Sequence, residues 1–189
     1  MTQRPSAADR LLATASDLFA REGIRSVGID RVLAEAGVAK ATLYGSFGSK
    51  EALVVATLER RDAADRATYL ARVAELPAGP ERVLASFDLA EEAAARRDFV
   101  GCVYANALNE FPDRSGPIAG AVLRHRAWVR QQWVDALAGR PDAEHLASEA
   151  QIAYDGALLG AKAAGSPEPI RIARALLIER LARTLTPNA

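Results

Sequence analysis

The stretch ATLYGSFGSKEAL, residues 41–53, combines residue types that commonly hold a phosphate group in proteins. Gly45 and Gly48 would let an anion approach the backbone closely, and the neighbouring serines and Lys50 would add hydrogen-bond donors and a positive charge. The phosphate could belong to a nucleotide, which would indicate an enzyme or a molecular switch. It could instead belong to the backbone of a nucleic acid, which would indicate a DNA- or RNA-binding protein.

The spacing of these residues argues against a nucleotide. A P-loop requires G-x-x-x-x-G-K-[ST], in which consecutive backbone N–H groups surround the phosphates and a hydroxyl reaches the magnesium ion. Here the glycines are three residues apart, a serine separates Gly48 from Lys50, and Glu51 stands where the Ser or Thr should be. No run of β-branched residues precedes the stretch to form the strand that leads into a P-loop. The remainder of the chain must therefore decide between the two interpretations.

The composition is that of an ordinary soluble globular protein. Half of the 189 residues are apolar and 25% are charged, and alanine is abundant while aromatic residues make up only 6%, which favours helices. The 24 basic and 24 acidic residues balance, so the whole chain has no basic excess. Residues 1–50 contain seven basic and five acidic residues, a net charge of +2, which has the right sign for contact with DNA but is small.

No pattern of catalytic or metal-binding residues is found. Cys102 is the only cysteine, which excludes an intrachain disulfide and a multi-cysteine metal site. His125 and His145 are the only histidines, and neither has a second histidine or a glutamate at metal-ligand spacing. We therefore expect no enzyme, no catalytic residue, no metal and no cofactor. The N-terminal segment lacks the apolar region of a signal peptide and no stretch is apolar enough to span a membrane, so we expect a cytoplasmic protein without membrane contact.

Apolar residues recur with the period of an α-helix in nearly every segment, and no segment alternates as a strand does. Ser6 with Asp9 forms a capping-box pattern at the start of the first helix, and glycine and proline separate the helices. The sequence therefore predicts an all-α fold with about nine helices. We expect them at about residues 6–22, 29–36, 40–46, 50–76, 81–97, 100–110, 117–138, 142–164 and 168–185.

These helices divide the chain into three parts. Residues 1–48 form a compact, homeodomain-like head of three helices, 49–76 a long connecting helix, and 77–189 a larger helical body. Within the head, residues 28–47 contain two short helices joined at Gly37, which is the pattern of a helix-turn-helix. Leu43 and Phe47 would face inward, and the second short helix would lie in the major groove of DNA.

Two lysines support contact with phosphates. Lys40 and Lys50 both stand at the start of a predicted helix, where the helix dipole disfavours a cation unless an anion also binds there. Two such positions one short helix apart suit a DNA strand on either side of the recognition helix. The alternative is that both lysines are simply solvated.

At these residues the sequence resembles the tetracycline-repressor (TetR) family of bacterial transcription regulators. The similar region runs from about residue 10 to residue 58, with family-match character to about residue 65, and includes LFAREG, AEAGV, ATLYGSF and SKEAL. The resemblance implies a DNA-binding homodimer, usually a repressor, that leaves a palindromic double-stranded DNA operator when a small-molecule effector binds to the body. It also implies contacts between the recognition helix and DNA. The positions expected at this DNA-binding surface are Gly28, Lys40, Ala41, Thr42, Tyr44, Gly45, Ser46 and Lys50.

Four positions depart from the family pattern, and one of them is Ala39, which replaces the serine that usually precedes Lys40. Gly45 and Ser46 replace the bulky polar or aromatic pair that usually follows the tyrosine, and Gly28 replaces a Ser or Thr at the start of the first motif helix. The smaller side chains remove possible contacts with bases and phosphates. They therefore support an alternative function, in which the chain is a helical small-molecule-binding or interaction protein with weakened or lost DNA binding.

The last two predicted helices suggest a dimer. Glycine inside a helix costs about 1 kcal/mol relative to alanine, so the two glycines within residues 145–164 indicate close approach of another helix. Four such helices from two chains would form a bundle, and a twofold dimer suits operator half-sites roughly 34–36 Å apart. The alternative is that both helices pack entirely within one chain. The residues expected at the dimer interface are small or aliphatic: Ala153, Gly156, Ala157, Gly160, Ala161, Ala164, Ile170, Ala173, Leu177 and Leu181.

A ligand pocket is expected in the body. Aromatic residues that also carry a polar group suit a small-molecule site, although an aromatic residue at helical spacing more often belongs to the core. The candidates for ligand binding share this mixed character or lie beside such residues: Phe87, Cys102, Tyr104, Asn106, Phe111, Trp128, Trp133 and Tyr154.

Overall fold

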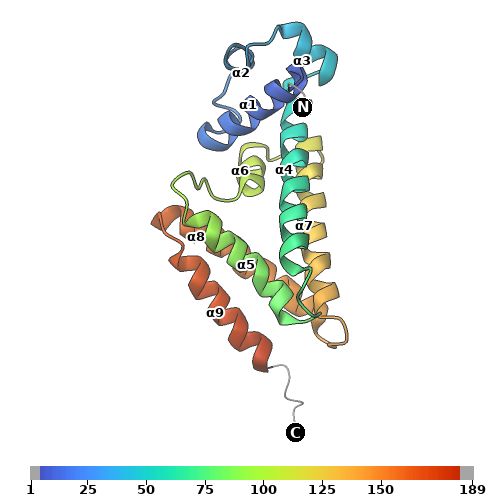
Figure 1. The fold of residues 1–189 in the computed structure, drawn as a ribbon, viewed down its shortest axis with the longest axis vertical. Helices are drawn as coiled ribbons and strands as arrows, with labels where there is room; N and C mark the ends of the chain where they lie inside the picture. The colour runs from blue at the N-terminus through green and yellow to red at the C-terminus, as the bar shows by residue number, and fades with distance from the viewer. Residues whose placement is uncertain (1–4, 184–189) are drawn as a thin grey trace. The chain divides into compact units, whose positions relative to one another are not determined.

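The computed structural model describes residues 5–183, and within them the chain forms nine α-helices and no strand (Figure 1). The predicted all-α fold is confirmed. The helices in chain order are α1 (Ala7–Glu22), α2 (Ile29–Ala36), α3 (Lys40–Ser46), α4 (Lys50–Val73), α5 (Pro80–Ala94), α6 (Val103–Glu110), α7 (Pro117–Ala136), α8 (Ala143–Ala164) and α9 (Glu168–Arg183).

The ends of the helices follow from local chemistry. At the start of α1 the Asp9 N–H donates to Ser6 Oγ at 3.1 Å and the Ser6 N–H donates to the Asp9 carboxylate at 3.1 Å, so the predicted capping box is present. The start of α6 differs from the prediction, because Gly101 has a φ of +80° and cannot belong to a helix. For this reason α6 begins at Val103, three residues later than the periodicity indicated.

The chain folds into two compact units. The first contains residues up to Ala64 together with Val103–His125, and the second contains Asp65–Cys102 together with the residues from Arg126 onward. Helices α4 and α7 each contribute to both units. The segment Val103–His125, which the sequence assigned to the body, thus belongs to the same unit as the three N-terminal helices.

The core of the first unit is built from the apolar stripes of its short helices. Leu11, Leu18 and Val32 are fully buried where α1 packs against α2. Leu43 from α3 and Leu53 from α4 are buried as well. Burial of a leucine or valine side chain contributes roughly 1.5–3 kcal/mol, so the short helices are held by this shared core rather than by their own propensity.

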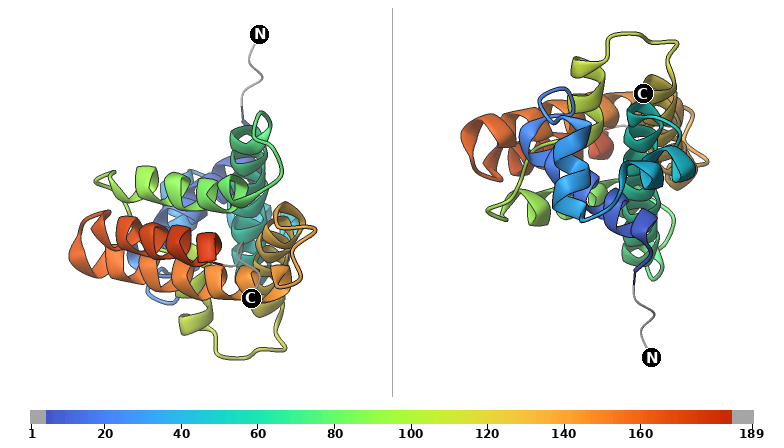
Figure 2. Two further views of the ribbon diagram at one scale, coloured as in Figure 1. Left: turned by 90° about the horizontal axis from the view of Figure 1, so that it is seen from below. Right: turned by 90° about the horizontal axis from the view of Figure 1, so that it is seen from above.

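The core of the second unit lies between α5, α8 and α9, which run side by side in Figures 1 and 2. Phe87 and Trp133 are fully buried, and their rings lie 6.5 Å apart. The Trp133 Nε1–H donates to Ser86 Oγ at 3.0 Å, which satisfies the polar atom of a side chain that is otherwise surrounded by apolar groups.

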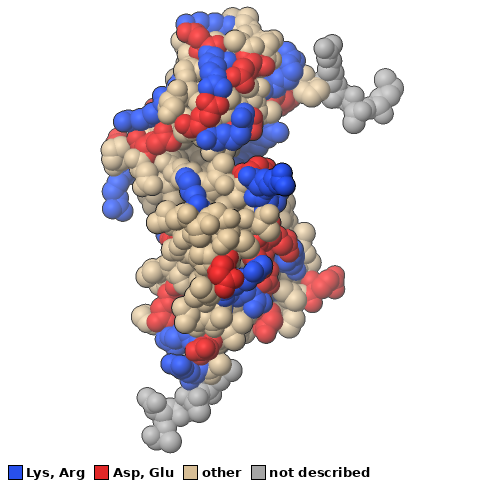
Figure 3. Space-filling view, turned by 90° about the vertical axis from the view of Figure 1, so that its left-hand side faces the viewer, with Lys and Arg blue, Asp and Glu red and all other residues tan. Residues whose placement is uncertain are grey.

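Opposite charges are mixed on the surface. On the face shown in Figure 3, Lys and Arg side chains alternate with Asp and Glu, and uncharged areas lie between them. In the first unit Arg31 contacts both Glu22 and Glu35, at 2.5 and 2.8 Å. Such exposed pairs contribute little to stability, but they partly neutralise the positive charge of the helix-turn-helix region. None of the helices in residues 5–183 has the length and apolar character that crossing a membrane requires.

Candidate nucleic-acid interface

The turn between α2 and α3 has the geometry of a helix-turn-helix. Gly37 adopts a left-handed conformation, with φ +62° and ψ +44°, which an L-residue with a side chain rarely adopts. The Val38 N–H then donates to the Leu33 carbonyl at 3.1 Å and closes the C-terminus of α2. Because Val32 and Leu33 from α2 and Leu43 from α3 are buried, one face of each short helix is fixed against the core.

The opposite face of α3 is directed to solvent. Tyr44 is 56% exposed, and Ala41, Gly45 and Ser46 are also exposed, whereas Thr42 is half-buried. A β-carbon added to Gly45 would meet no atom within 4 Å. Nothing in the surrounding fold therefore requires glycine at this position, although glycine weakens a helix.

Lys40 begins α3 and is also exposed. Its side chain is 59% accessible, and its ammonium lies 3.7 Å from the carboxylate of Asp30, which is itself 84% accessible. An exposed pair at that distance is weak and gives way readily to a stronger anion. Gly28, the residue before α2, is exposed too, and no side-chain hydrogen bond caps that helix.

Gly48 and Ser49, which suggested a phosphate site, have structural roles. Gly48 has a φ of +80° and its N–H donates to the Leu43 carbonyl at 3.1 Å, so it turns the chain directly after α3. The Ser49 hydroxyl accepts a hydrogen bond from the Ala52 N–H at 3.0 Å and caps α4. These two residues make the sharp connection between α3 and α4.

Lys50 has a different position from the one expected. Its ammonium donates to the carbonyl oxygens of Ile24 and Val27, both at 2.7 Å, and lies 5.7 Å from the centre of the Phe19 ring. Burial lowers the pKa of this ammonium, and the negative charge of Glu110 opposes that change. The side chain thus holds the α1–α2 connection, residues 23–28, and its expected contact with a phosphate stays a prediction.

A second residue holds the same connection. The Glu110 carboxylate, at the end of α6, accepts hydrogen bonds from the N–H groups of Ile24 at 2.9 Å and Arg25 at 2.6 Å. This role could not be predicted from the sequence, because Glu110 lies 86 residues after Ile24. The residues next to Glu110 have the pattern of an ordinary surface helix. Because the connection is not helical, its backbone N–H and C=O groups lack the hydrogen bonds that a helix provides. Lys50 and Glu110 together supply partners for four of these groups.

The eight residues expected to bind a ligand are divided between the two units. Tyr104, Asn106 and Phe111 lie in the first unit, and the other five lie in the second. In the second unit Phe87 and Trp133 are fully buried, and the Phe87 and Tyr154 rings meet edge to face at 5.2 Å. These aromatic residues are core residues, which was the alternative considered for them.

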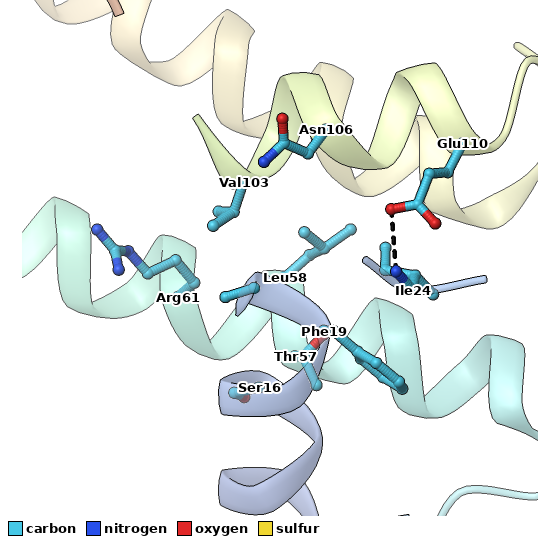
Figure 4. Close-up of a pocket in the computed structure, with 10 residues that line it drawn as sticks. Ser16, Phe19, Ile24, Thr57, Leu58, Arg61, Val103, Asn106 and Glu110 are labelled. Atoms are coloured by element: carbon cyan, nitrogen blue, oxygen red, sulfur yellow. Dashed lines mark hydrogen bonds between the residues drawn. The ribbon is translucent and has the colours of Figure 1, made fainter. Parts of the chain in front are cut away.

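The remaining candidates are dispersed. Cys102 is partly buried against the core of the second unit, and the Trp128 ring meets the Tyr69 ring edge to face at 5.8 Å. In the first unit Tyr104 stacks on the His125 ring at 3.6 Å, and the Arg25 guanidinium lies over the Phe111 ring at 5.4 Å. Asn106 lines a pocket that is bounded by α1, α4 and α6 (Figure 4).

The expected interface residues of α8 and α9 fall into two groups. Five are buried within this chain and pack in its own core: Ala157, Ala161, Ile170, Leu177 and Leu181. The others are exposed or half-buried: Ala153, Gly156, Gly160, Ala164 and Ala173.

The two glycines of α8 differ in the same way. A β-carbon on Gly160 would lie 2.9 Å from Pro169, so this glycine is explained by the close approach of α9 in the same chain. A β-carbon on Gly156 would meet nothing within 4 Å. Packing within the chain therefore explains the glycine at position 160 but not the one at position 156.

Replacement of Lys50 tests its structural role. Lys50→Met removes two charge-assisted hydrogen bonds and leaves two carbonyl groups without their donor, so we expect the free energy of unfolding to fall by about 1–3 kcal/mol. The matched control is Lys40→Met, which removes an exposed lysine and should change stability by less than about 0.5 kcal/mol. Urea unfolding followed by circular dichroism measures both. Equal stability of the two variants would contradict the structural role.

Replacement of Gly45 tests whether the fold needs glycine there. Because the added methyl group has open space and the position is helical, Gly45→Ala should raise the free energy of unfolding by up to about 1 kcal/mol. The control, Gly48→Ala, places a side chain at a φ of +80° and should lower it. Thermal and urea unfolding give both values, and a loss of stability in Gly45→Ala would show that the glycine serves the fold.

Comparisons with known proteins agree with this geometry. Residues 11–57 match the sequence model of the family described as bacterial regulatory proteins, tetR family. SCO4454, a TetR-family transcriptional regulator from Streptomyces coelicolor, is 34% identical in sequence, and its structure superposes with a TM-score of 0.82 over 95% of this chain and 94% of its own.

Two mycobacterial regulators are also similar. The HTH-type transcriptional regulator Rv1255c of Mycobacterium tuberculosis is 27% identical over 86% of this chain and 93% of its own length. The HTH-type transcriptional regulator EthR of the same species is 38% identical over 85 residues, which cover 43% of this chain and 38% of its own. Because the likeness to SCO4454 extends through both units and beyond the helix-turn-helix, the chain belongs to the TetR family of DNA-binding transcriptional regulators.

Proposed function

We propose that this regulator represses transcription by binding a palindromic operator as a homodimer, and that a small-molecule effector releases it. The observation that carries the DNA contact is the exposed face of α3. On this face the large aromatic side chain of Tyr44 is 56% exposed. The next residue is Gly45, and the fold has open space for a side chain at that position. An exposed aromatic side chain and a helical glycine both lower the stability of the folded chain. Where contacts within the chain do not explain such residues, we expect a surface that binds a partner.

The exposed face of α3 suits the major groove. Tyr44 supplies an aromatic ring and Lys40 a positive charge at the start of the helix. Ala41 and Gly45 lie one helical turn apart, and their small size permits close approach of α3 to the base edges. The methyl group of an alanine is also suited to contact with the methyl group of thymine. Because Lys50 is engaged within the chain, we expect the phosphate contacts to come mainly from Lys40 and from backbone N–H groups.

A group of exposed apolar residues on α8 and α9 supports the homodimer. Ile152 and Leu159 on α8 are 73% and 69% exposed, and they are seven residues apart on one face, with Gly156 between them. Ile172 and Leu176 on α9 are exposed as well. The two helices pack against each other within the chain. Exposed apolar residues on two adjacent helices are suited to a twofold contact with a second copy of the chain.

A second function remains in competition with the first. The small residues Gly45 and Ser46 remove side chains that would otherwise contact DNA, and ion pairs such as those of Arg31 reduce the positive charge of the head. These features favour a helical protein that binds small molecules or partners and has lost affinity for DNA. The two functions differ in one property, which is specific binding to an operator.

A gel-shift experiment with the DNA that flanks the gene for this chain separates them. We expect a specific band at low salt for the wild-type chain, and Tyr44→Ala should weaken it by about 10- to 100-fold, as expected for loss of one base contact worth 1–3 kcal/mol. The control, Leu123→Ala, removes a large exposed side chain outside the helix-turn-helix and should leave affinity unchanged. If a folded dimer gives no specific band, the competing function is correct. If Tyr44→Ala binds like the wild type, α3 is not the recognition helix.

The dimer surface is tested by placing a charge on it. Leu159→Glu puts two like charges near a twofold axis, so we expect the dimer to dissociate, with the molecular mass in sedimentation equilibrium falling to that of one chain. Leu70→Glu is the matched control, because Leu70 is 51% exposed on α4 and should leave the dimer intact. Dissociation of both variants, or of neither, would exclude α8 as part of the interface.

A further inference from the structure

A pocket in the first unit is bounded by α1, α4 and α6 (Figure 4). Its apolar walls come from Phe19 of α1, Leu58 of α4 and Val103 of α6, with Ile24 at one end. The cavity volume is about 100 Å³, and the pocket is partly open to solvent. An engineered lysozyme cavity of about 150 Å³ holds benzene, so this pocket has room for a molecule of about that size and not for a much larger one.

The space between these side chains is a gap in the packing of the first unit. Phe19, Ile24 and Leu58 are almost fully buried, yet they line a cavity. Protein interiors are normally packed as closely as organic crystals, and the side chains around a void lose dispersion contacts on one side. A molecule with apolar surface would restore these contacts.

The hydroxyl groups beside the pocket are used within their own helices. Ser16 Oγ donates to the Leu12 carbonyl at 2.8 Å, and Thr57 Oγ1 donates to the Val54 carbonyl at 2.7 Å. Their protons are therefore not available to a ligand.

The charged and amide side chains at the pocket also have partners. The two carboxylate oxygens of Glu110 accept the N–H groups of Ile24 and Arg25. Arg61 and Asn106 have interaction partners of their own. The polar groups around the cavity are thus engaged already, and the surface that remains for a ligand is apolar.

We propose that this pocket binds a small uncharged apolar molecule of about the size of benzene, held between Phe19, Leu58 and Val103. Such a molecule gains dispersion contacts and leaves water. A charged ligand would instead lose hydration without an unused polar partner to replace it. The residues that line the pocket all belong to the first unit, which also contains the helix-turn-helix.

The site adjoins the connection between α1 and α2. Ile24 lines the pocket, and its N–H and carbonyl are held by Glu110 and Lys50. A molecule in contact with both Ile24 and Val103 links this connection to α6, so it should change the affinity for the operator. This consequence rests on the proposed function, but binding of the ligand does not.

The first experiment measures binding without DNA. Benzene is the probe, and the full chain carries isotope-labelled methyl groups for NMR. We expect nuclear Overhauser effects between benzene and the methyl groups of Ile24, Leu58 and Val103, with a Kd in the millimolar range that suits so small a ligand. Effects confined to methyl groups of the second unit, or none in a solution saturated with benzene, would overturn the proposal.

Two charged probes with the same ring test the chemical class. Benzoate and benzylammonium should bind at least about tenfold more weakly than benzene, because the pocket has no unused partner for either charge. The same NMR titration gives the three affinities. A charged probe that binds as tightly as benzene would overturn the assignment to uncharged ligands.

Substitutions then test the location. Ala20 lines the pocket, so Ala20→Leu should fill it and weaken benzene binding by about tenfold or more. Ala13→Leu is the matched control, because Ala13 is exposed on the same helix and does not line the pocket. Equal benzene affinity in both variants and the wild type would overturn the site.

A second variant keeps the location testable if Ala20→Leu does not fold. Val103→Ala enlarges the pocket without crowding it, so we expect the preference to move from benzene toward the larger ethylbenzene, relative to the wild type. The ratio of the two affinities, measured by the same titration, decides the point. An unchanged ratio would mean that Val103 is not part of the binding site.

The last arm separates this proposal from the proposed function. If the chain binds its operator, benzene should change the operator affinity of the wild type and of Ala13→Leu but have little effect on Ala20→Leu. No change in the wild type, or a change of equal size in all three, would overturn the regulatory role of the pocket. If the wild type binds no operator at all, the proposed function fails, and the NMR titration still decides whether the pocket binds apolar molecules.

Discussion

The hydrogen bonds to the connection between α1 and α2 hold the DNA-binding unit together. Residues 23–28 form no helix, so their backbone groups need partners from elsewhere. Lys50 provides donors for two carbonyl oxygens and Glu110 accepts from two N–H groups, so a cation from α4 and an anion from α6 hold one short segment. The angle at which α2 leaves α1 depends on this segment, and the position of α3 depends on α2 through the turn at Gly37.

This arrangement explains which residues of the GSFGSK segment are available to a partner. Gly48 ends α3, Ser49 caps α4 and Lys50 points inward, so three residues that looked like a phosphate site are used by the fold. Gly45 and Ser46 have no such role and lie on the exposed face beside Tyr44. The fold thus leaves the face of α3 around Tyr44 exposed, and we propose that this face contacts DNA.

The helices and the turn could be predicted from the sequence because their causes are local. The Ser6–Asp9 capping box and the left-handed Gly37 need only residues within one or two turns, and both are present in the structure. Glu110 was missed because its partners lie 86 and 85 residues away. The aromatic residues were ambiguous for a different reason, since a core and a ligand pocket require the same apolar pattern, and Phe87 and Trp133 are fully buried in the core. In α8, a small side chain such as Ala161 packs equally well inside the chain or at an interface, and here it is buried within the chain.

We propose that the exposed face of α3 makes the main contacts with DNA, while Lys50 keeps its hydrogen bonds within the chain. The most direct measurement is an NMR titration of the full chain with the DNA that flanks its gene, in which the amide signals of α3 and the ammonium signal of Lys50 are followed together. The account predicts that the signals of Ala41, Tyr44 and Gly45 shift on binding, while the Lys50 ammonium keeps its hydrogen bonds to Ile24 and Val27. A shift of the Lys50 ammonium with unchanged signals along α3 would contradict it.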